Sequence, residues 1–264
     1  MTAPNKVVEM TGIEKRFGPV EVLRGVDFEL YENEVLALLG DNGAGKSTLI
    51  KTLSGYYQPD AGQIRIGGQA VSFGTPHEAR DHGIETIYQD LALFDNLDVA
   101  ANVFAGKEKV GGGWRKMLGF VDRKAMRNEA REAVSQMAIN IPRIDQEVSA
   151  FSGGQRQRLA IARALIIEPV LIVFDEAVSA LDVSVRAQVL DLLADLCRKR
   201  PLSYLFISHD LSVVRSVTDR VLVMKSGKIV EQGETEAVFT NPQHPYTQTL
   251  IAAAPKLPTL GMAV

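Results

Sequence analysis

Short apolar runs of strand length fall into two blocks of the chain, one on each side of a central stretch with helical spacing. In the first block, residues 7–30 read as two strands around Gly18-Pro19, with apolar and polar positions alternating in the second strand. The unbroken apolar run Val35–Leu39 predicts another strand, as do residues 63–66 and, for a buried strand, 83–88. The chain is therefore expected to open with an antiparallel sheet that leads into buried strands.

The central stretch, from about Gln89 to Ile166, carries its apolar residues at helical spacing. Asp122 stands where it can cap a charged helix that runs to about Met137. Residues 107–120 have no clear period, which is typical of an exposed loop. This stretch predicts a separate helical subdomain.

After Pro169 strand and helix patterns alternate. The run Val170–Phe174 is apolar throughout, as expected of a strand buried on both faces. Helices are expected from about Val183, over Leu211–Val217 and from the segment 241–246 to near Pro255. Strands are expected at residues 204–207, 221–224 and 228–230. Such an order is typical of an α/β fold.

The composition fits a globular chain of this kind. Of the 264 residues, 46% are hydrophobic, enough for one sizeable core with a smaller subdomain. Lys and Arg number 29 against 32 Asp and Glu, so the net charge of −3 argues against nucleic acid as the main partner. The single cysteine, Cys197, has no intrachain partner, and neither a signal peptide nor a membrane-spanning run is apparent. The cytosol is therefore the expected compartment.

The segment Gly40–Thr48 fits the phosphate-loop pattern G-x-x-x-x-G-K-[ST] without a mismatch, between a predicted strand and a predicted helix. Its glycines let backbone N–H groups turn toward phosphate oxygens, and the helix adds its positive end. Lys46 is expected to reach the outer phosphates and Ser47 to ligate Mg²⁺. A chance match in a glycine-bearing turn is the alternative. The residues predicted to bind nucleotide here are Gly40, Asn42, Gly43, Gly45, Lys46, Ser47 and Thr48.

Two carboxylates follow the most apolar strand of the chain. Asp175 and Glu176 come at its carboxyl end, which we expect to lie beside the phosphate loop. Asp175 suits Mg²⁺ binding from behind the direct ligands or through a water molecule, and Glu176 suits polarising the water that attacks the γ-phosphate. The alternative is an acidic turn in solvent.

A second anion site is predicted where a helix begins with two glycines. Ser152 is placed to cap this helix, while the glycines leave N–H groups free at its positive end. An ordinary capped helix is the alternative interpretation. The residues concerned are Ser152, Gly153, Gly154 and Gln155.

In their order along the chain these motifs resemble those of the ATP-binding cassette family. The set comprises the phosphate loop, Gln89 after a strand, the signature Ser152–Gln155, Asp175-Glu176, Ser179–Asp182, and Ser208–Asp210 after a strand. The resemblance runs from Val7 to about Pro255 and implies a P-loop NTPase core of the RecA-like type with an antiparallel β subdomain and a helical subdomain. We predict one nucleotide-binding domain over residues 1–264, with its core at 1–88 and 167–240, the helical subdomain at 89–166 and a tail at 241–264.

The resemblance also implies roles for single residues in a head-to-tail dimer, where each ATP lies between the phosphate loop of one subunit and the signature helix of the other. Phe17 would stack on adenine, where the family usually has tyrosine. Gln89 would touch Mg²⁺ and the attacking water and link to a membrane partner. Asp182 would contact the opposite subunit, and His209 would hold the γ-phosphate and Glu176. The predicted catalytic residues are Glu176, His209, Gln89 and Lys46, and the predicted Mg²⁺ ligands are Ser47, Gln89 and Asp175.

Packing or solvent exposure is the alternative for Phe17 and Gln89, and a core histidine for His209. Two departures from the family pattern remove no reacting group. Phe151 stands where leucine usually precedes the signature serine, and Ala177-Val178 replaces the usual proline-threonine.

The two halves of the chain resemble different branches of the family. Residues 40–46, 76–80 and 83–89 are similar to ribose- and fructose-type uptake cassettes. Residues 180–188 and 243–247 are similar to dipeptide and oligopeptide cassettes, so the chain resembles a mosaic joined near residues 153–157.

Together these features predict the peripheral ATPase subunit of a bacterial-type importer at the cytoplasmic face of the inner membrane. The expected partners are a second copy or a related cassette, integral membrane permease subunits and, indirectly, a solute-binding protein. A sugar is favoured as the solute because the segment after Gln89, which usually docks on the membrane subunit, lies in the sugar-like half; a peptide stays open. The alternatives are a soluble cassette ATPase without a membrane partner and a chimeric nucleotide-binding scaffold without productive turnover.

Overall fold

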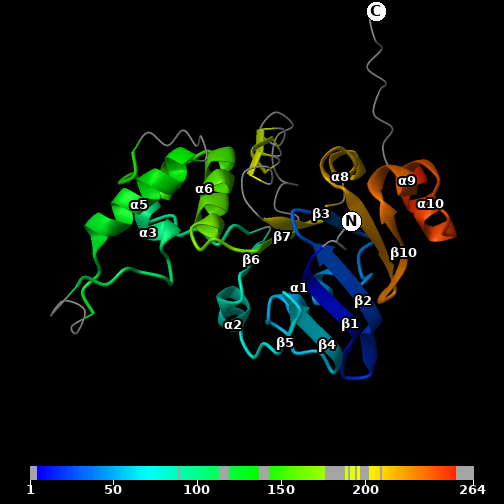
Figure 1. The fold of residues 1–264 in the computed structure, drawn as a ribbon. Coiled ribbons are helices and arrows are strands. Elements are labelled where there is room, and N and C mark those ends of the chain that lie inside the picture. Colours follow the sequence, from blue (N-terminus) through cyan, green and yellow to red (C-terminus); the bar gives the residue numbers. More distant parts are fainter. Residues whose placement is uncertain are drawn as a thin grey trace, which may run out of the picture.

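The structure is a computed structural model, and it describes most of the chain outside a few short segments. The described residues are 5–88, 90–112, 119–136, 143–175, 188–189, 191–193, 195–196, 202–208 and 210–253. They form two sheets, with one group of helices at one end of the molecule and another at the opposite end (Figure 1).

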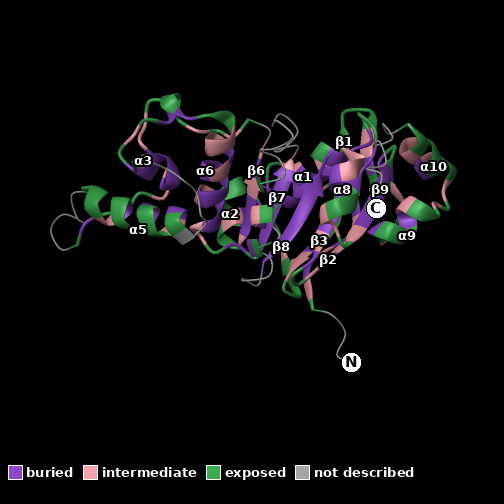
Figure 2. Ribbon diagram, turned by 90° about the horizontal axis from the view of Figure 1, so that it is seen from above, coloured by how far each residue is buried: buried purple, intermediate pink, exposed green. Residues whose placement is uncertain are grey.

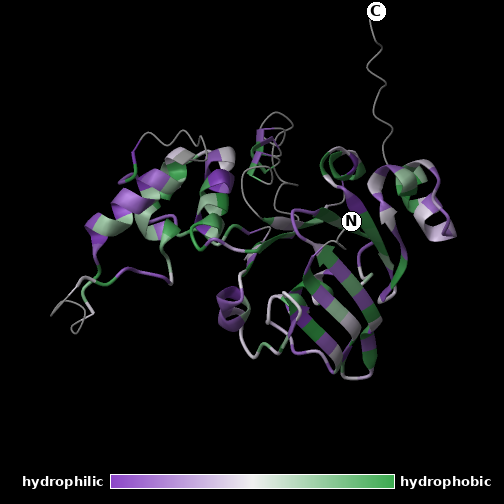
Figure 3. Cartoon of the chain, viewed as in Figure 1, coloured by the Kyte–Doolittle hydropathy of each residue, from purple (hydrophilic) through white to green (hydrophobic). Residues whose placement is uncertain are grey.

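The first sheet is antiparallel and has the strand order β2-β1-β4-β5. Its strands are β1 (Lys6–Phe17), β2 (Val20–Tyr31), β4 (Ala61–Ile66) and β5 (Gln69–Val71). Apolar and polar residues alternate along β1 and β2, which Figure 3 shows as alternating bands, because one face of the sheet is buried and the other faces solvent. The predicted entry sheet is confirmed, and β5 is an addition to it.

The second sheet has six strands in the order β10-β9-β3-β8-β7-β6. The strands are β3 (Val35–Leu39), β6 (Ile84–Ile87), β7 (Leu171–Asp175), β8 (Ser203–Ile207), β9 (Arg220–Lys225) and β10 (Lys228–Glu234). Neighbours pair in parallel from β6 to β9, and only β10 runs antiparallel to its neighbour. The carboxyl ends of β3, β8 and β7 therefore meet at the same edge of the sheet.

The helices agree with the predicted alternation and add two short ones. They are α1 (Lys46–Leu53), α2 (Pro76–Asp81), α3 (Val99–Val103), α5 (Arg123–Gln136), α6 (Gly153–Leu165), α8 (Leu211–Val217), α9 (Thr235–Thr240) and α10 (Pro245–Ala252), with a 3-10 turn at Val148–Ala150. The described residues between 188 and 196 are also helical. The chain thus has the α/β fold of a P-loop NTPase with an antiparallel sheet and a helical part, while the division at residues 88 and 167 stays a prediction.

The core lies on both faces of the six-stranded sheet. On one face, Leu36 and Leu38 of β3 pack with α1 and the antiparallel sheet. On the other, Ala37 and Leu39 pack with α8 and α9, and the part of the sheet toward β6 packs with α3, α5 and α6. Figure 2 shows these strands as buried between helices with exposed outer surfaces. This layering holds β3 in the middle of the molecule.

The helical part is fixed to the sheet at β6. The predicted cap is confirmed, since the Ala125 backbone N–H donates to Asp122 Oδ1 at 3.0 Å. Arg163 of α6 donates to the carbonyl oxygens of Leu91 and Ala92 at 2.9 and 2.7 Å, which ties the segment after β6 to this helix.

Among the described residues, none of the helices combines the length and the apolar character that a membrane span requires.

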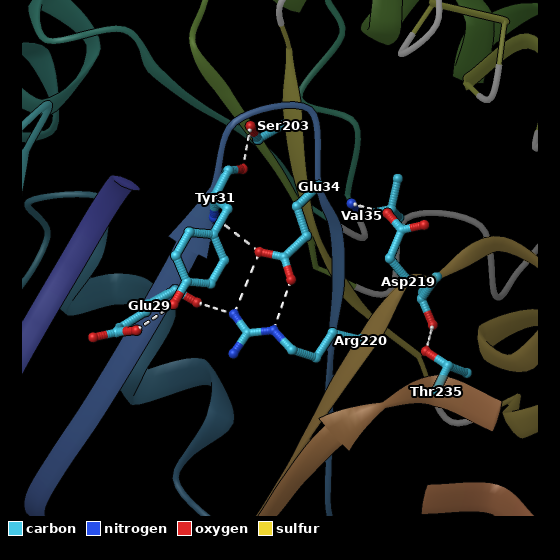
Figure 4. Close-up of polar contacts among 9 residues, drawn as sticks. Glu29, Tyr31, Glu34, Val35, Ser203, Asp219, Arg220 and Thr235 are labelled. Atoms are coloured by element: carbon cyan, nitrogen blue, oxygen red, sulfur yellow. Dashed lines mark hydrogen bonds and ion pairs between the residues drawn. The ribbon is translucent and has the colours of Figure 1, made fainter. Parts of the chain in front are cut away.

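The amino end of β3 is held by a closed network of polar side chains (Figure 4). The Glu34 carboxylate accepts from Arg220 Nε at 2.7 Å and from the Tyr31 backbone N–H at 2.8 Å. Arg220 Nη2 also donates to the Glu29 carbonyl at 2.5 Å, and the Tyr31 hydroxyl donates to the Glu29 carboxylate at 2.6 Å. These groups satisfy one another, which is what burial of charged and polar groups requires.

Candidate active site

The phosphate loop connects the carboxyl end of β3 to α1, as the sequence predicts. α1 begins at Lys46, and its N-cap is Gly45, with φ +108°. A glycine has no side chain that competes for the first N–H groups of the helix, so no cap stands between the positive end of α1 and an anion.

Positive backbone angles shape the loop at its glycines. Gly40 has φ +149°, and a Cβ there would lie 2.3 Å from the carbonyl oxygen of Met224 in β9. Gly43 has φ +83° with open space around the missing Cβ. Gly40 is thus required by a close approach to a neighbouring strand, whereas Gly43 is favoured by the backbone angle alone.

Lys46 lies inside the loop. Its side chain is 6% exposed, and Nζ donates to the carbonyl oxygens of Gly40 at 2.7 Å and Asp41 at 3.0 Å. Asn42 and Ser47 are exposed and Thr48 is half-buried. A buried ammonium held by backbone carbonyl groups beside the start of a helix is an arrangement that suits a phosphate chain.

Asp175 lies at the same edge of the sheet as the loop. It is the last residue of β7 and pairs in register with Ile207 of β8, the neighbour of β3. The Asp175 side chain is half-buried. The Ser47 hydroxyl and the Asp175 carboxylate are oxygen ligands of the kind that Mg²⁺ takes together with substrate phosphates. The described residues hold no cluster of three or more His, Cys, Asp or Glu that would form a closed protein cage for a metal.

The signature segment forms a capping box at the start of α6. Gln155 N–H donates to Ser152 Oγ at 3.4 Å, and Ser152 N–H donates to Gln155 Oε1 at 2.9 Å. Ser152 and Gly153 are exposed and Gly154 is half-buried. α6 packs near β6, and β6 is three strands away from β3 in the sheet, so the two predicted anion sites lie on separate elements of the chain (Figure 1).

Phe17 ends β1 with 41% of its surface exposed. Its ring meets the ring of Tyr57 edge-on at 5.0 Å between centroids, and Lys15 Nζ lies 5.8 Å from its centre. An exposed aromatic face is compatible with stacking on a base. Four predicted site residues, Gln89, Glu176, Asp182 and His209, lie outside the described residues.

Sequence reasoning missed one contact of the loop. Tyr246 of α10 reaches it, and the backbone N–H of Asp41 donates to the Tyr246 hydroxyl at 2.8 Å. The only signal in the sequence was the segment 243–247, whose similarity to peptide cassettes assigned no role to the tyrosine.

Comparison with known families agrees with this geometry. The family model described as "ABC transporter" matches residues 23–179, more than half of the chain. The chain belongs to the ABC transporter family. A second model, "Oligopeptide/dipeptide transporter, C-terminal region", matches residues 230–261 of the cassette.

Relatives of the cassette come from both branches that the resemblance named. The "Xylose/arabinose import ATP-binding protein XylG" of Sulfolobus acidocaldarius is 42% identical over 85% of the chain and 86% of that protein. The "Fructose import ATP-binding protein FrcA" of Rhizobium meliloti is 42% identical over 86% and 87%, and the "Dipeptide transport ATP-binding protein DppF" of Escherichia coli is 41% identical over 90% and 70%. The predicted similarity to sugar and peptide cassettes is therefore confirmed.

Solved structures support the fold of the cassette. The cbiO1 protein of Clostridium perfringens, described as part of an ABC transporter complex, superposes with a TM-score of 0.76 at 25% identity over 90% of this chain and 92% of its own. The ADP conformation of another ABC cassette gives a TM-score of 0.78 at 22% identity over 94% and 99%, which supports the fold alone. Since ATP-binding proteins of ABC transporters are ATPases, the cassette is a nucleotide-binding ATPase of this family.

Proposed function

We propose that the chain is the ATP-binding and ATP-hydrolysing subunit of a bacterial ABC importer. The observation that carries this proposal is the loop after β3, where glycines with positive φ lead into the glycine-capped start of α1 around the buried Lys46 ammonium. Backbone N–H groups, a helix terminus and an enclosed cation together suit a triphosphate. The importer assignment is supported by relatives that are named for import or transport.

Within this proposal, Ser47 and Asp175 hold Mg²⁺, and Gln89 is a third ligand by resemblance. When bound there, Mg²⁺ would supply positive charge that stabilises the phosphates during transfer. The Ser47 hydroxyl is exposed beside the buried Lys46, and the Asp175 carboxylate lies at the same edge of the sheet. Both are hard oxygen ligands, which fits this cation.

Hydrolysis is assigned to Glu176 and His209 by their matching positions in the family. In the sequence Glu176 directly follows Asp175, the last residue of β7. We infer that its carboxylate orients the attacking water and that His209 holds Glu176 and the γ-phosphate.

Two copies, or one copy and a related cassette, complete the site in this proposal. It is supported by the separation of the phosphate loop from the signature helix α6 within one chain. An exposed Ser152 and an exposed Gly153 are open to the ATP of a second subunit, where Asp182 also contacts the partner. ATP then closes the dimer, and hydrolysis reopens it.

The dimer would drive integral membrane permease subunits from the cytoplasmic face of the inner membrane, with a solute-binding protein delivering the solute. A sugar is favoured, in line with the relatives named for xylose, arabinose and fructose. A peptide is the second candidate because residues 230–261 match the peptide-transporter C-terminal region.

The test is the mass in solution of the Glu176→Gln variant with and without Mg-ATP, with Lys46→Ala as the control that should bind no nucleotide. An ATP-dependent shift from monomer to dimer supports the proposal. Nucleotide bound by a persistent monomer contradicts the dimer mechanism. Reconstitution with sugar-type and with peptide-type permeases, each with its binding protein, then decides the solute by which pair stimulates phosphate release.

A further inference from the structure

Helix α10 is fixed against the same strands that carry the phosphate loop. Tyr246 and Leu250 pack on a core formed in part by Ala37 and Leu39 of β3. The helix starts with Pro245 at its first turn, and His244 caps it by accepting the Tyr246 backbone N–H at 3.1 Å. Its position is therefore set by packing and capping, independently of any ligand.

The segment before α10 is anchored as well. The Glu231 carboxylate of β10 accepts the backbone N–H groups of Gln243 at 2.7 Å and His244 at 3.0 Å. Two charge-assisted bonds at the helix entrance leave little freedom in the direction that α10 takes.

Tyr246 joins this anchored helix to the loop. Its hydroxyl accepts the Asp41 backbone N–H at 2.8 Å, and Lys225 Nζ lies 4.6 Å from the centre of its ring. Burial raises the pKa of the Tyr246 phenol, so the hydroxyl stays protonated at neutral pH. Through its ring and its hydroxyl, Tyr246 of α10 thus connects β9 to the start of the phosphate loop.

Asp41 is held from both sides of its backbone. Tyr246 binds its N–H, while its carbonyl accepts from Lys46 Nζ at 3.0 Å and from the Ala44 N–H at 3.1 Å. The Asp41 residue is exposed, and its carboxylate also acts on the Tyr246 hydroxyl, where it adds to the rise in the pKa of the phenol. The Asp41 N–H belongs to the same peptide unit as the Gly40 carbonyl, which accepts from Lys46 Nζ at 2.7 Å. The hydroxyl therefore acts on a peptide unit that helps to place the Lys46 ammonium.

We propose that Tyr246 is a positioning residue of the phosphate loop, which it holds in the conformation that receives the nucleotide phosphates. The inference rests on the proposed nucleotide site and extends it to a segment that lies within the match to the peptide-transporter C-terminal region. A loop held in place before binding loses less freedom when the ligand arrives, so affinity rises.

The experiment compares the Tyr246→Phe variant with the wild-type chain. Binding of a fluorescent ADP analogue is titrated without partner subunits, and steady-state hydrolysis is measured over a range of ATP concentrations. Loss of one hydrogen bond to the loop predicts about 3- to 10-fold weaker binding and an equal rise in the KM for ATP. kcat should stay within about twofold, since Tyr246 touches no reacting group, and the melting temperature should stay close to the wild-type value.

Tyr31→Phe is the matched control, because it also removes one tyrosyl hydrogen bond, at the opposite end of β3. It should leave nucleotide affinity unchanged. Lys225→Met removes the cation beside the Tyr246 ring but keeps a side chain of similar length at position 225. It should weaken nucleotide binding by about twofold.

Three results overturn the inference. Wild-type affinity of Tyr246→Phe, with binding lost in Lys46→Ala, removes the role of Tyr246 and leaves the nucleotide site intact. A fall in melting temperature together with affinity and kcat makes Tyr246 a merely structural residue. Absence of binding by the wild-type chain itself overturns both this inference and the proposed function.

Discussion

The polar groups at the two ends of β3 differ in how they are hydrogen-bonded. At the amino end, Glu34, Arg220 and Tyr31 satisfy one another, and the Asp219 carboxylate accepts the Val35 backbone N–H at 2.8 Å (Figure 4). At the carboxyl end, the loop leaves the glycine-capped start of α1 without a side-chain acceptor. The same strand thus ends in a closed network on one side and in a donor-rich loop on the other.

Groups that contribute to stability and groups that can bind a ligand therefore lie at opposite ends of a strand of five residues. Polar groups that hydrogen-bond to each other contribute to folding and are not available to bind a ligand. At a helix start that no side chain caps, the positive end of the helix is available to a ligand. Substitutions at the two ends should therefore change different measurements.

The largest expected effect is that of Lys46→Ala at the carboxyl end. Removing the enclosed ammonium should lower nucleotide affinity and ATPase activity by about 100-fold or more, because phosphate charge then meets only neutral dipoles. The free energy of unfolding should change by no more than about 1–2 kcal/mol. Lys228→Ala, at an exposed position of β10, is the control. Nucleotide affinity of Lys46→Ala within threefold of wild type would show that the loop is no phosphate site.

Glu34→Ala at the amino end should give the reverse result. The Glu34 and Arg220 side chains are 10% and 19% exposed, so deletion of the carboxylate leaves a largely buried guanidinium without its main partner. We expect a loss of about 2–4 kcal/mol in the free energy of unfolding, measured in urea, with nucleotide affinity within twofold of wild type. The nearby exposed Glu32→Ala serves as the control and should be nearly neutral. A large loss of affinity in Glu34→Ala would mean that the two ends are coupled.

Glycine substitutions sharpen the comparison within the loop itself. Gly40→Ala places a Cβ 2.3 Å from the Met224 carbonyl, so the loop or β9 must move, at about 1–3 kcal/mol of stability and with weaker nucleotide binding. Gly43→Ala meets open space and should cost about 1–2 kcal/mol from backbone strain. Gly67→Ala, in the turn between β4 and β5 with φ +54° and open space, controls for strain alone. A larger loss of stability and of nucleotide affinity in Gly43→Ala than in Gly40→Ala, measured by melting curves and titrations, would contradict this account.

The smallest expected effect concerns pH at the amino end. Hydrogen bonds from Lys6 and Tyr31 hold the pKa of the Glu29 carboxyl below its ordinary value of 4.5. A lowered pKa in the folded state contributes stability above the unfolded pKa, and this is lost as the pH falls through the folded pKa. Glu29→Gln should therefore lose less stability than wild type between pH 6 and about pH 3 in urea unfolding. Equal slopes for the two proteins would remove the Glu29 contribution, which water screens because the side chain is 38% exposed.

Local sequence signals were sufficient for the elements that organise the site. The phosphate loop, the strand before it and the helix after it were predicted because glycine spacing, an apolar run and helical period all lie within a few residues of one another. The helix Leu211–Val217 was predicted with its observed bounds. Short elements were missed, since α2 and α9 have six residues each and show no period. A Thr75 cap and Pro76 at the first turn were the available signal for α2.

Contacts between distant segments were beyond the reach of the sequence. Asp41 and Tyr246 lie 205 positions apart, and nothing in either local pattern indicates the other. The same holds for the approach of Gly40 to Met224, which depends on the parallel pairing of β3 with β9. The roles assigned to Gln89, Glu176, Asp182 and His209 stay predictions, as these residues lie outside the described part of the chain.

The position of β3 in the middle of its sheet sets an order of events during synthesis on the ribosome. Its two neighbours, β8 and β9, begin at Ser203 and Arg220, so β3 leaves the ribosome long before either partner exists. At about 5–20 residues per second, that delay is on the order of ten seconds or more. The β1-β2 hairpin can pair within this time, whereas the phosphate loop waits for β9 and α10. The sheet that holds the phosphate loop is therefore completed only after β8 and β9 have been made, long after the loop itself.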